Sequence, residues 1–201
     1  DRYADDCHYM GGCVLASDML KWATSMRGYN ALPPDPRFRD DWRTVWLRRL
    51  ERTPAFIEPW MAHQAWGPYW VPGSVCRDFS AVEAATLAVG GWADAYTNSV
   101  PRLLEGLSCP AAGIIGPWAH IMPYAAVPGP AIGFLAECVR WFDRWLKGIE
   151  NGIDAEPRLR AWIEEPVPPA TYYAERPGRW VGVGWPPSDA RSARFALGTG
   201  S

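Results

Sequence analysis

The chain has 201 residues, of which 48% are hydrophobic and 21% are charged. This length and composition allow one domain with a substantial core, or parts of two or three domains, and they exclude a disordered chain. The 20 Lys and Arg residues are interspersed with 22 Asp and Glu residues. No basic surface for nucleic acid or anionic lipid is therefore expected.

The pattern of Cys and His residues argues against a disulfide framework and a metal site. The five cysteines are odd in number, widely spaced and without a C-x-x-C pair, so neither a disulfide framework nor a zinc site is predicted. The three histidines, His8, His63 and His120, lie far apart and none has a metal-ligand spacing. We therefore expect no metal and no cofactor. The 13 Trp residues are expected to serve mainly in packing.

The sequence indicates no membrane segment. No apolar run approaches the roughly 18 to 20 residues that span a bilayer, and the first residues lack the basic and apolar regions of a signal peptide. These features predict a cytoplasmic protein without a membrane partner. The chain starts at Asp1 and not at Met, so the missing signal peptide says little about the precursor. The sequence leaves the oligomeric state open.

Residues 1–80 have the pattern of a helical subdomain. Apolar residues recur at helical spacing over Cys13–Met26, with Gly28 as the expected stop, and again over Phe38–Arg52. A shorter helix is predicted from Ile57 to about residue 65. Gly and Pro residues then interrupt the chain before the next segment.

Residues 81–152 have an α/β pattern. Short, continuously apolar runs at 84–90 and 111–116 predict two strands buried on both faces, with a helix over 97–106 between them. A clear amphipathic helix is predicted over 131–147. Its expected inward residues are Leu135, Cys138, Val139, Phe142, Trp145 and Leu146.

Residues 153–201 change to a period of two. Leu159, Ala161 and Ile163 alternate with charged or aromatic residues, as on a strand with one solvated face. The tail is rich in Pro, Gly and aromatic residues. We therefore predict that this segment opens a β domain.

Two side chains that could transfer protons follow the two buried strands. Asp94 comes just after the first strand, and His120 comes just after the second, 26 residues later. The carboxyl ends of parallel strands share one edge of a sheet, where functional groups of α/β proteins collect. Taken singly, each residue more often has a structural role, as a loop cap or a packed side chain. As a pair they favour a carboxylate that orients an imidazole.

The sequence contains no credible nucleophile for this pair. In α/β-hydrolases the nucleophile precedes the acid, which precedes the histidine. The upstream serines are Ser17, Ser25, Ser74 and Ser80, and none lies in a G-x-S-x-G turn. The upstream cysteines, Cys7, Cys13 and Cys76, do not occupy such a turn either.

Local motifs resemble one family. The segments Gly-Gly-Trp-Ala-Asp-Ala-Tyr at 90–96 and Gly-Pro-Trp-Ala-His at 116–120 closely resemble the acid and histidine motifs of the cocaine-esterase-like (CocE/NonD) serine hydrolases. These are relatives of the X-Pro dipeptidyl-peptidases, glutaryl acylases and α-amino-acid ester hydrolases. The likeness extends to residues 1–12, to Trp141–Gly148 and to the stretches around Arg179 and Trp185.

The resemblance implies the C-terminal part of an α/β-hydrolase, with a helical cap at 1–80, the last core strands at 81–152 and the start of a jelly-roll at 153–201. Its implied chemistry is acyl transfer from an ester or amide to serine and then to water. Asp94 would orient His120, and His120 would act as general base and acid. Tyr96 is similar to an acyl-pocket position, with Trp92 and Trp118 as further walls, although packing beneath the site is as good an explanation for each.

The family pattern also includes a front half with the serine turn and the oxyanion donors, which this sequence lacks. The chain thus resembles an internal fragment whose activity needs the missing N-terminal segment. A non-catalytic, Trp-rich binding or structural module is the alternative, favoured by exposed coplanar Trp rings. Ester, amide, X-Pro peptide and β-lactam side chain all remain open as substrates.

Overall fold

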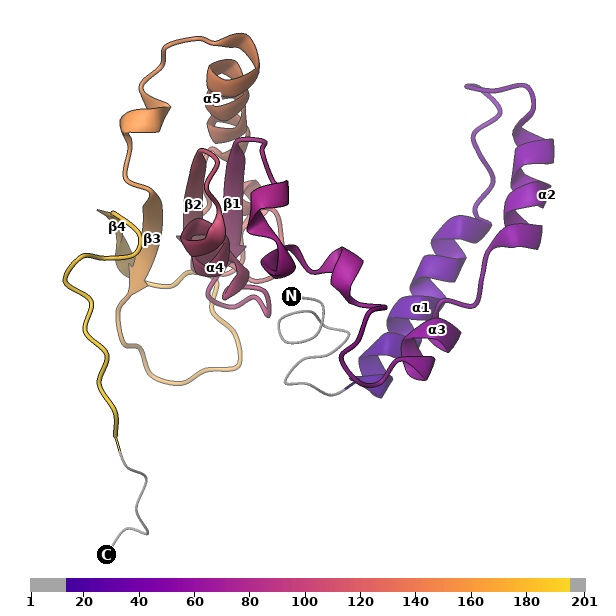
Figure 1. Cartoon of the computed structure of the whole chain (residues 1–201), viewed down its shortest axis with the longest axis horizontal. Coiled ribbons are helices and arrows are strands. Elements are labelled where there is room, and N and C mark those ends of the chain that lie inside the picture. Colours follow the sequence, from indigo (N-terminus) through magenta and orange to yellow (C-terminus); the bar gives the residue numbers. More distant parts are fainter. Residues whose placement is uncertain (1–13, 196–201) are drawn as a thin grey trace, which may run out of the picture. The chain divides into compact units, whose positions relative to one another are not determined.

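The chain divides into two compact units, Asp1–Arg77 and Asp78–Ser201. The computed structural model describes residues 14–195 of these units (Figure 1). Cys7, His8, Cys13 and the family-like motif at 1–12 lie outside the described residues. The division after Arg77 lies close to the boundary predicted at residue 80, whereas the assignment of a cap stays a prediction.

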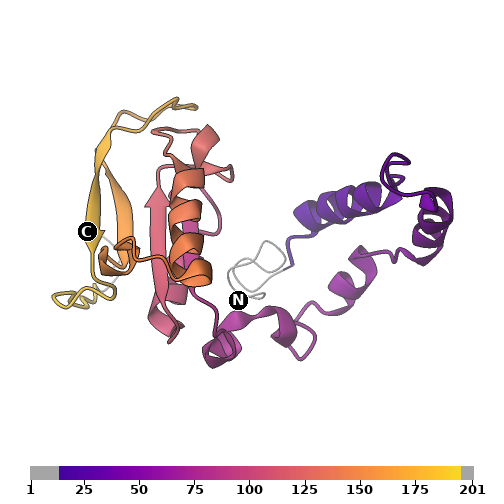
Figure 2. The same ribbon diagram turned by 90° about the horizontal axis from the view of Figure 1, so that it is seen from above.

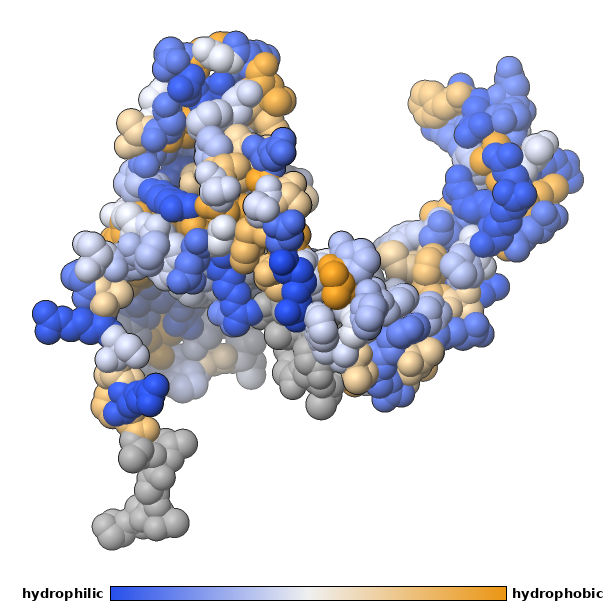
Figure 3. All heavy atoms as spheres, in the orientation of Figure 1, coloured by the Kyte–Doolittle hydropathy of each residue, from blue (hydrophilic) through white to orange (hydrophobic). Residues whose placement is uncertain are grey.

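The first unit is helical over its described part. It contains helices α1 (Ala16–Ala31), α2 (Trp42–Arg52) and α3 (Ile57–Ala62), followed by short 3-10 turns η2 (Val71–Gly73) and η3 (Val75–Arg77). Met19 and Ala23 on α1 are buried, and the Trp46 indole N–H donates to the carbonyl of Ala31 at 2.7 Å. Helix α2 has no buried residue, and its surface is mainly hydrophilic (Figure 3).

Two details of the predicted helices are wrong. Helix α1 continues through Gly28, because one glycine costs a helix only about 1 kcal/mol. The second helix begins at Trp42 and not at Phe38, which is 83% exposed. A turn precedes it, in which the Arg37 N–H donates to the Asp35 carboxylate at 2.9 Å. This bond to a side chain pairs the Arg37 N–H outside a helix, so the helix begins only after the turn.

The second unit is built on one four-stranded sheet. Its strands are β1 (Thr86–Gly91), β2 (Ala111–Gly116), β3 (Leu159–Glu164) and β4 (Gly178–Val183), in the order β1-β2-β3-β4. The pairs β1/β2 and β2/β3 are parallel, and β3/β4 is antiparallel. The two strands predicted before and after a crossover helix are therefore confirmed as parallel neighbours.

Helix α4 (Ser99–Gly106) covers one face of this sheet. Its buried Val100 and Leu104 join a core with Ala88, Ile115, Leu159 and Ala161. Gly113 keeps the helix close to β2, because a Cβ there would lie 2.8 Å from a methyl group of Leu104. Side chains alternate along a strand, so Ile114, which is only 2% exposed, is buried against the other face. The predicted crossover helix thus begins at Ser99 and packs as an α/β layer.

Helix α5 (Phe134–Lys147) follows a short 3-10 turn, η5 (Pro123–Ala125), and its orientation differs from the prediction. It buries Trp141, whose indole N–H approaches the carbonyl of Ala85 at 3.4 Å. Four of the six residues predicted to face inward are more than half exposed: Leu135, Val139, Phe142 and Leu146. Apolar side chains accordingly reach the surface in this region (Figure 3). The helix has two adjacent apolar stripes, and the buried one is the stripe that contains the large Trp141 ring.

The segment after residue 152 also differs from expectation. A 3-10 turn, η6 (Ile153–Ala155), leads into β3, which pairs with β2. Strands β3 and β4 therefore continue the α/β sheet (Figure 2). Leu159 and Ala161 are buried as predicted, whereas Ile163 is 43% exposed. A jelly-roll beyond these strands stays a prediction.

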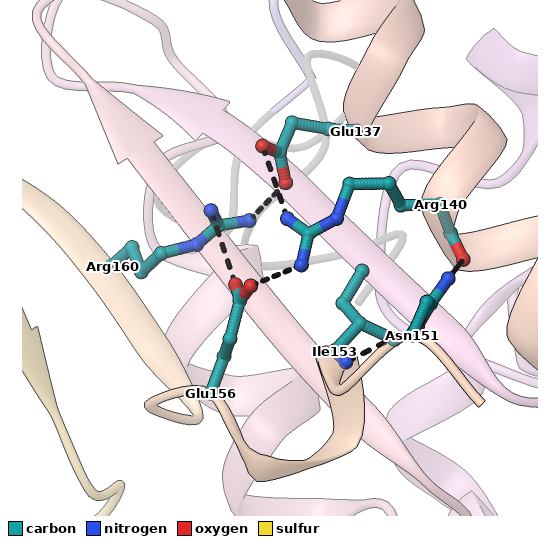
Figure 4. A network of polar contacts seen from close by, with 6 residues as sticks. All are labelled: Glu137, Arg140, Asn151, Ile153, Glu156 and Arg160. Carbon is teal, nitrogen blue, oxygen red and sulfur yellow. Dashed lines mark hydrogen bonds and ion pairs between the residues drawn. The ribbon is translucent and has the colours of Figure 1, made fainter.

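A network of four charged side chains joins α5 to β3 (Figure 4). Glu137 and Arg140 come from α5, Arg160 comes from β3, and Glu156 lies just before that strand. Arg160 donates to Glu137 at 2.6 Å and lies 3.3 Å from Glu156, and Arg140 pairs with both glutamates. The hydrogen bond from Arg160 and the nearby Arg140 lower the pKa of Glu137, although partial burial opposes this effect. The network therefore favours the carboxylate form of Glu137 and fixes α5 against the sheet.

Candidate active site

The turn after β1 fixes the Asp94 carboxylate. One of its oxygens accepts the Tyr96 backbone N–H at 3.0 Å. The Thr97 hydroxyl lies within hydrogen-bond distance of the carbonyl of Asp94, at 2.8 Å, and of the carbonyl of Gly91. The Asp94 side chain is 12% exposed. This segment, Trp92–Thr97, is called the acid turn below, and its hydrogen bonds leave the second carboxylate oxygen available to another partner.

That partner is His120. Its Nδ1 lies 2.8 Å from the second oxygen of Asp94, although 26 residues separate the two in the chain. His120 belongs to a segment after β2, Pro117–Met122, called the histidine turn below. The ring is largely solvent-exposed, with 79% of the side chain accessible. With the hydrogen on Nδ1, the carboxylate accepts it and Nε2 becomes the proton acceptor.

The parallel register brings the two turns together. Gly91 at the end of β1 is paired with Gly116 at the end of β2. Beyond this pair, the Trp92 N–H donates to the carbonyl of Gly116 at 2.9 Å, and the Ala93 N–H donates to the carbonyl of Trp118 at 3.0 Å. The backbone therefore sets the separation of the acid and the imidazole, as expected for groups that follow the carboxyl ends of two neighbouring parallel strands.

A hollow of about 480 Å³ lies beside the pair. Among the described residues, Asp94 and His120 are the only ionisable ones that line it, and the other walls are backbone and apolar side chains: Val89, Gly90, Gly91, Trp118, Ala119, Ile121, Met122, Pro123 and Phe134. Ile121, Met122 and Phe134 were not among the site residues predicted from the sequence. The first two directly follow His120 in a strand-end segment, which is a signal that could have indicated them.

The three aromatic residues predicted to bind substrate have different surroundings. The ring of Tyr96 lies 5.5 Å from that of His120, outside the residues that line the hollow. Trp92 is 45% exposed, and its indole N–H donates to the carbonyl of Trp162 at 2.6 Å. Trp118 borders the hollow but is only 1% exposed. Their contact with a substrate stays a prediction.

Residues 14–195 show neither a cluster of His, Cys, Asp and Glu side chains that could hold a metal nor a helix long and apolar enough to cross a membrane. Within the same residues, the bond to Asp94 is the only hydrogen bond of the His120 ring. The site as described is thus a carboxylate-imidazole pair beside an apolar hollow.

Comparisons with known proteins identify a family for this chain. Residues 1–122, more than half of the chain, match the family described as X-Pro dipeptidyl-peptidase (S15 family). Two proteins named as serine esterases, from Mycobacterium bovis and Mycobacterium tuberculosis, are each 28% identical over 124 residues. These matches cover 58% of this chain but only 18% of each relative, so the chain corresponds to a small part of their length.

The fold also matches a solved protein. The crystal structure of a CocE/NonD family hydrolase from Staphylococcus aureus superposes with a TM-score of 0.53 at 15% identity, over 79% of this chain and 27% of that one. At this identity the match concerns the fold, which is α/β-hydrolase-like. Together with the family match over residues 1–122, it confirms the resemblance seen in the two motifs. The chain belongs to the X-Pro dipeptidyl-peptidase (S15) family.

Proposed function

We propose that this chain supplies the acid and the histidine of a serine-hydrolase triad that cleaves an ester or amide bond. The observation that carries the proposal is the 2.8 Å contact between His120 Nδ1 and the Asp94 carboxylate at the shared edge of two parallel strands. The serine-esterase names of the relatives and the family match support it. The nucleophile belongs to a segment upstream of Asp1.

The proposed mechanism uses the two nitrogens of His120 for different tasks. Asp94 accepts the Nδ1 hydrogen and stabilises the imidazolium, while Nε2 removes the hydroxyl proton as the serine oxygen attacks the carbonyl carbon. The imidazolium then gives that proton to the leaving alcohol or amine, and an acyl-serine forms. Water repeats the sequence, since His120 takes one of its protons and returns it to the serine when the acid is released.

The walls of the hollow indicate the kind of group that lies next to the scissile bond. Ile121 and Met122 are 45% and 57% exposed, and Phe134 adds an aromatic edge. Within the part of the chain that the structure describes, no cationic side chain other than His120 lines this space. A charged acyl or leaving group would lose hydration there without a partner. We therefore propose that the substituent next to the scissile bond is uncharged and largely apolar. Tyr96, Trp92 and Trp118 would lie near it. The first unit would serve as a cap.

The alternative of a Trp-rich binding module finds less support. Coplanar, exposed indoles would form a stacking surface, but the rings near the site are tilted. The Trp118 and Trp180 rings meet at 54°, and those of Trp162 and Trp180 meet at 69°. Trp118 is buried as well. This arrangement is typical of packing around a crevice.

The test is hydrolysis of short-chain nitrophenyl esters and of an X-Pro anilide by the complete gene product. His120→Ala is expected to lower kcat/KM by about a thousandfold or more, because the base and the acid are both lost. His63→Ala is the matched control, since His63 stacks on Tyr69 in the other unit, and a change of less than about twofold is expected. Equal activity of His120→Ala and the wild type, or no hydrolysis of any ester or amide, would overturn the proposal.

A further inference from the structure

Trp118 lies where the acid turn and the histidine turn meet. Its backbone carbonyl accepts the N–H of Ala93 at 3.0 Å, and Ala93 directly precedes Asp94. In the chain, Trp118 comes two residues before His120 and two residues after the end of β2. Trp118 therefore joins the acid turn to the histidine turn directly, next to the bond between the Trp92 N–H and the carbonyl of Gly116.

The neighbouring strand ends leave space for Trp118 only because they are glycines. A Cβ at Gly91 would overlap the carbonyl oxygen of Trp118, and a Cβ at Gly116 would overlap its indole ring. The first overlap is with a backbone atom, and a Cβ is fixed by its own backbone, so no side-chain rotation could relieve it. The close approach of the two turns thus depends on Trp118 occupying one position between two glycines.

The indole itself is anchored on three sides. Its N–H donates to the carbonyl of Pro130 at 2.8 Å, its ring rests on Gly116, and its centroid lies 6.1 Å from that of Trp180 on β4. Only 1% of the residue is exposed. A large ring held in this way keeps one rotamer, and the attached carbonyl keeps one position.

The catalytic pair needs such support from its backbone. The His120 side chain is 79% exposed, and its hydrogen bond to Asp94 is its only one within residues 14–195. One hydrogen bond at the surface contributes little to order, whereas a catalytic pair must be held to within about 0.5 Å. The packing of His120 does not provide this precision, so the turns must.

We propose that Trp118 is a positioning residue, which sets the separation of Asp94 and His120 by locking the acid turn to the histidine turn. This inference rests on the proposed function for its catalytic consequence. It also explains why Trp118 is buried beside the hollow instead of forming an open wall of it.

The test compares two conservative variants of the complete gene product. Trp118→Phe keeps an aromatic ring but loses the donor to Pro130, and kcat is expected to fall about ten- to a hundredfold with KM nearly unchanged. Trp141→Phe is the matched control, because this buried residue also loses an indole bond, to the carbonyl of Ala85 at 3.4 Å, and Ala85 precedes β1 at the strand end opposite both turns. Its kcat should stay within about twofold.

A double-mutant cycle separates positioning from general damage. If Trp118 acts through the pair, Trp118→Phe should cause no further loss in an Asp94→Asn background, whereas general damage would lower kcat by the same factor in both backgrounds. Gly91→Ala displaces the Trp118 carbonyl from the other side and should reproduce the loss. It provides the test if Trp118→Phe does not fold.

A measurement without turnover keeps this inference distinct from the proposed function. Nitrogen NMR of labelled histidine reports the fraction of His120 that carries its hydrogen on Nδ1, and this fraction should fall in Trp118→Phe but not in Trp141→Phe. Loss of the proposed function would appear as full activity of His120→Ala. Equal kinetics and equal tautomer fractions in Trp118→Phe and Trp141→Phe would overturn the role of Trp118.

Discussion

Replacing Glu137 with Gln removes one charge from the network that fixes α5 to β3 and keeps the size of the side chain. The Glu137 side chain is 20% exposed, and it accepts a hydrogen bond from Arg160 at 2.6 Å with Arg140 nearby. A hydrogen bond between charged groups contributes about 1.5–3 kcal/mol. Because the partners are partly solvated, we expect Glu137→Gln to lower the free energy of unfolding by about 1–2 kcal/mol at neutral pH.

The pH dependence of this effect follows from the lowered pKa of Glu137. The hydrogen bond from Arg160 is the main cause of the lowering. A carboxyl group with a lower pKa in the folded state stabilises that state above its unfolded pKa of about 4.3, and this stabilisation disappears as the pH falls through the folded value. The difference between Glu137→Gln and the wild type should therefore shrink below about pH 4.

Urea unfolding of the 201-residue chain at several pH values measures both quantities. Glu105→Gln on the exposed side of α4 is the control and should change the unfolding free energy by less than about 0.5 kcal/mol. If Glu137→Gln has no effect at neutral pH, or has the same effect at acidic pH as at neutral pH, the network does not stabilise the fold as argued.

Two further predictions concern packing and backbone conformation. Leu104 is completely buried between α4 and the sheet, so Leu104→Ala should destabilise the chain by about 2–5 kcal/mol in thermal or urea unfolding. A loss below about 1 kcal/mol would contradict the core assignment. Gly148 ends α5 with a φ of 69°, so Gly148→Ala should lower the free energy of unfolding by about 1 kcal/mol although the Cβ meets no neighbour. An unchanged melting temperature would show that the turn adopts another conformation.

The sequence sufficed to predict the parts of the site that depend on strand ends. Short apolar runs that end in Gly91 and Gly116 are typical of buried parallel strands, and a parallel pair places the following residues at one edge. The proximity of Asp94 and His120 follows from that geometry, and the structure places them 2.8 Å apart. The order of the acid before the histidine, together with the residues of both motifs, also indicated the family.

The parts that depend on packing between distant segments were not accessible from the sequence. Helix α5 has two adjacent apolar stripes, and only its contact with the sheet shows that Trp141 is the buried side. The alternation around Arg160 indicated a solvated strand face, whereas the charged network half-buries that residue and β3 joins the α/β sheet. The anchoring of Trp118 by Pro130 and Trp180 likewise arises only after folding.

The central claim is that one carboxylate holds one imidazole in a fixed tautomer. Nitrogen NMR of histidine-labelled protein tests it directly, by comparing His120 in the wild type and in Asp94→Asn at neutral pH. The account predicts that the wild-type ring carries its hydrogen mainly on Nδ1 and that this preference is lost in the variant, while His63 is unchanged. Identical His120 spectra in the two proteins would contradict it.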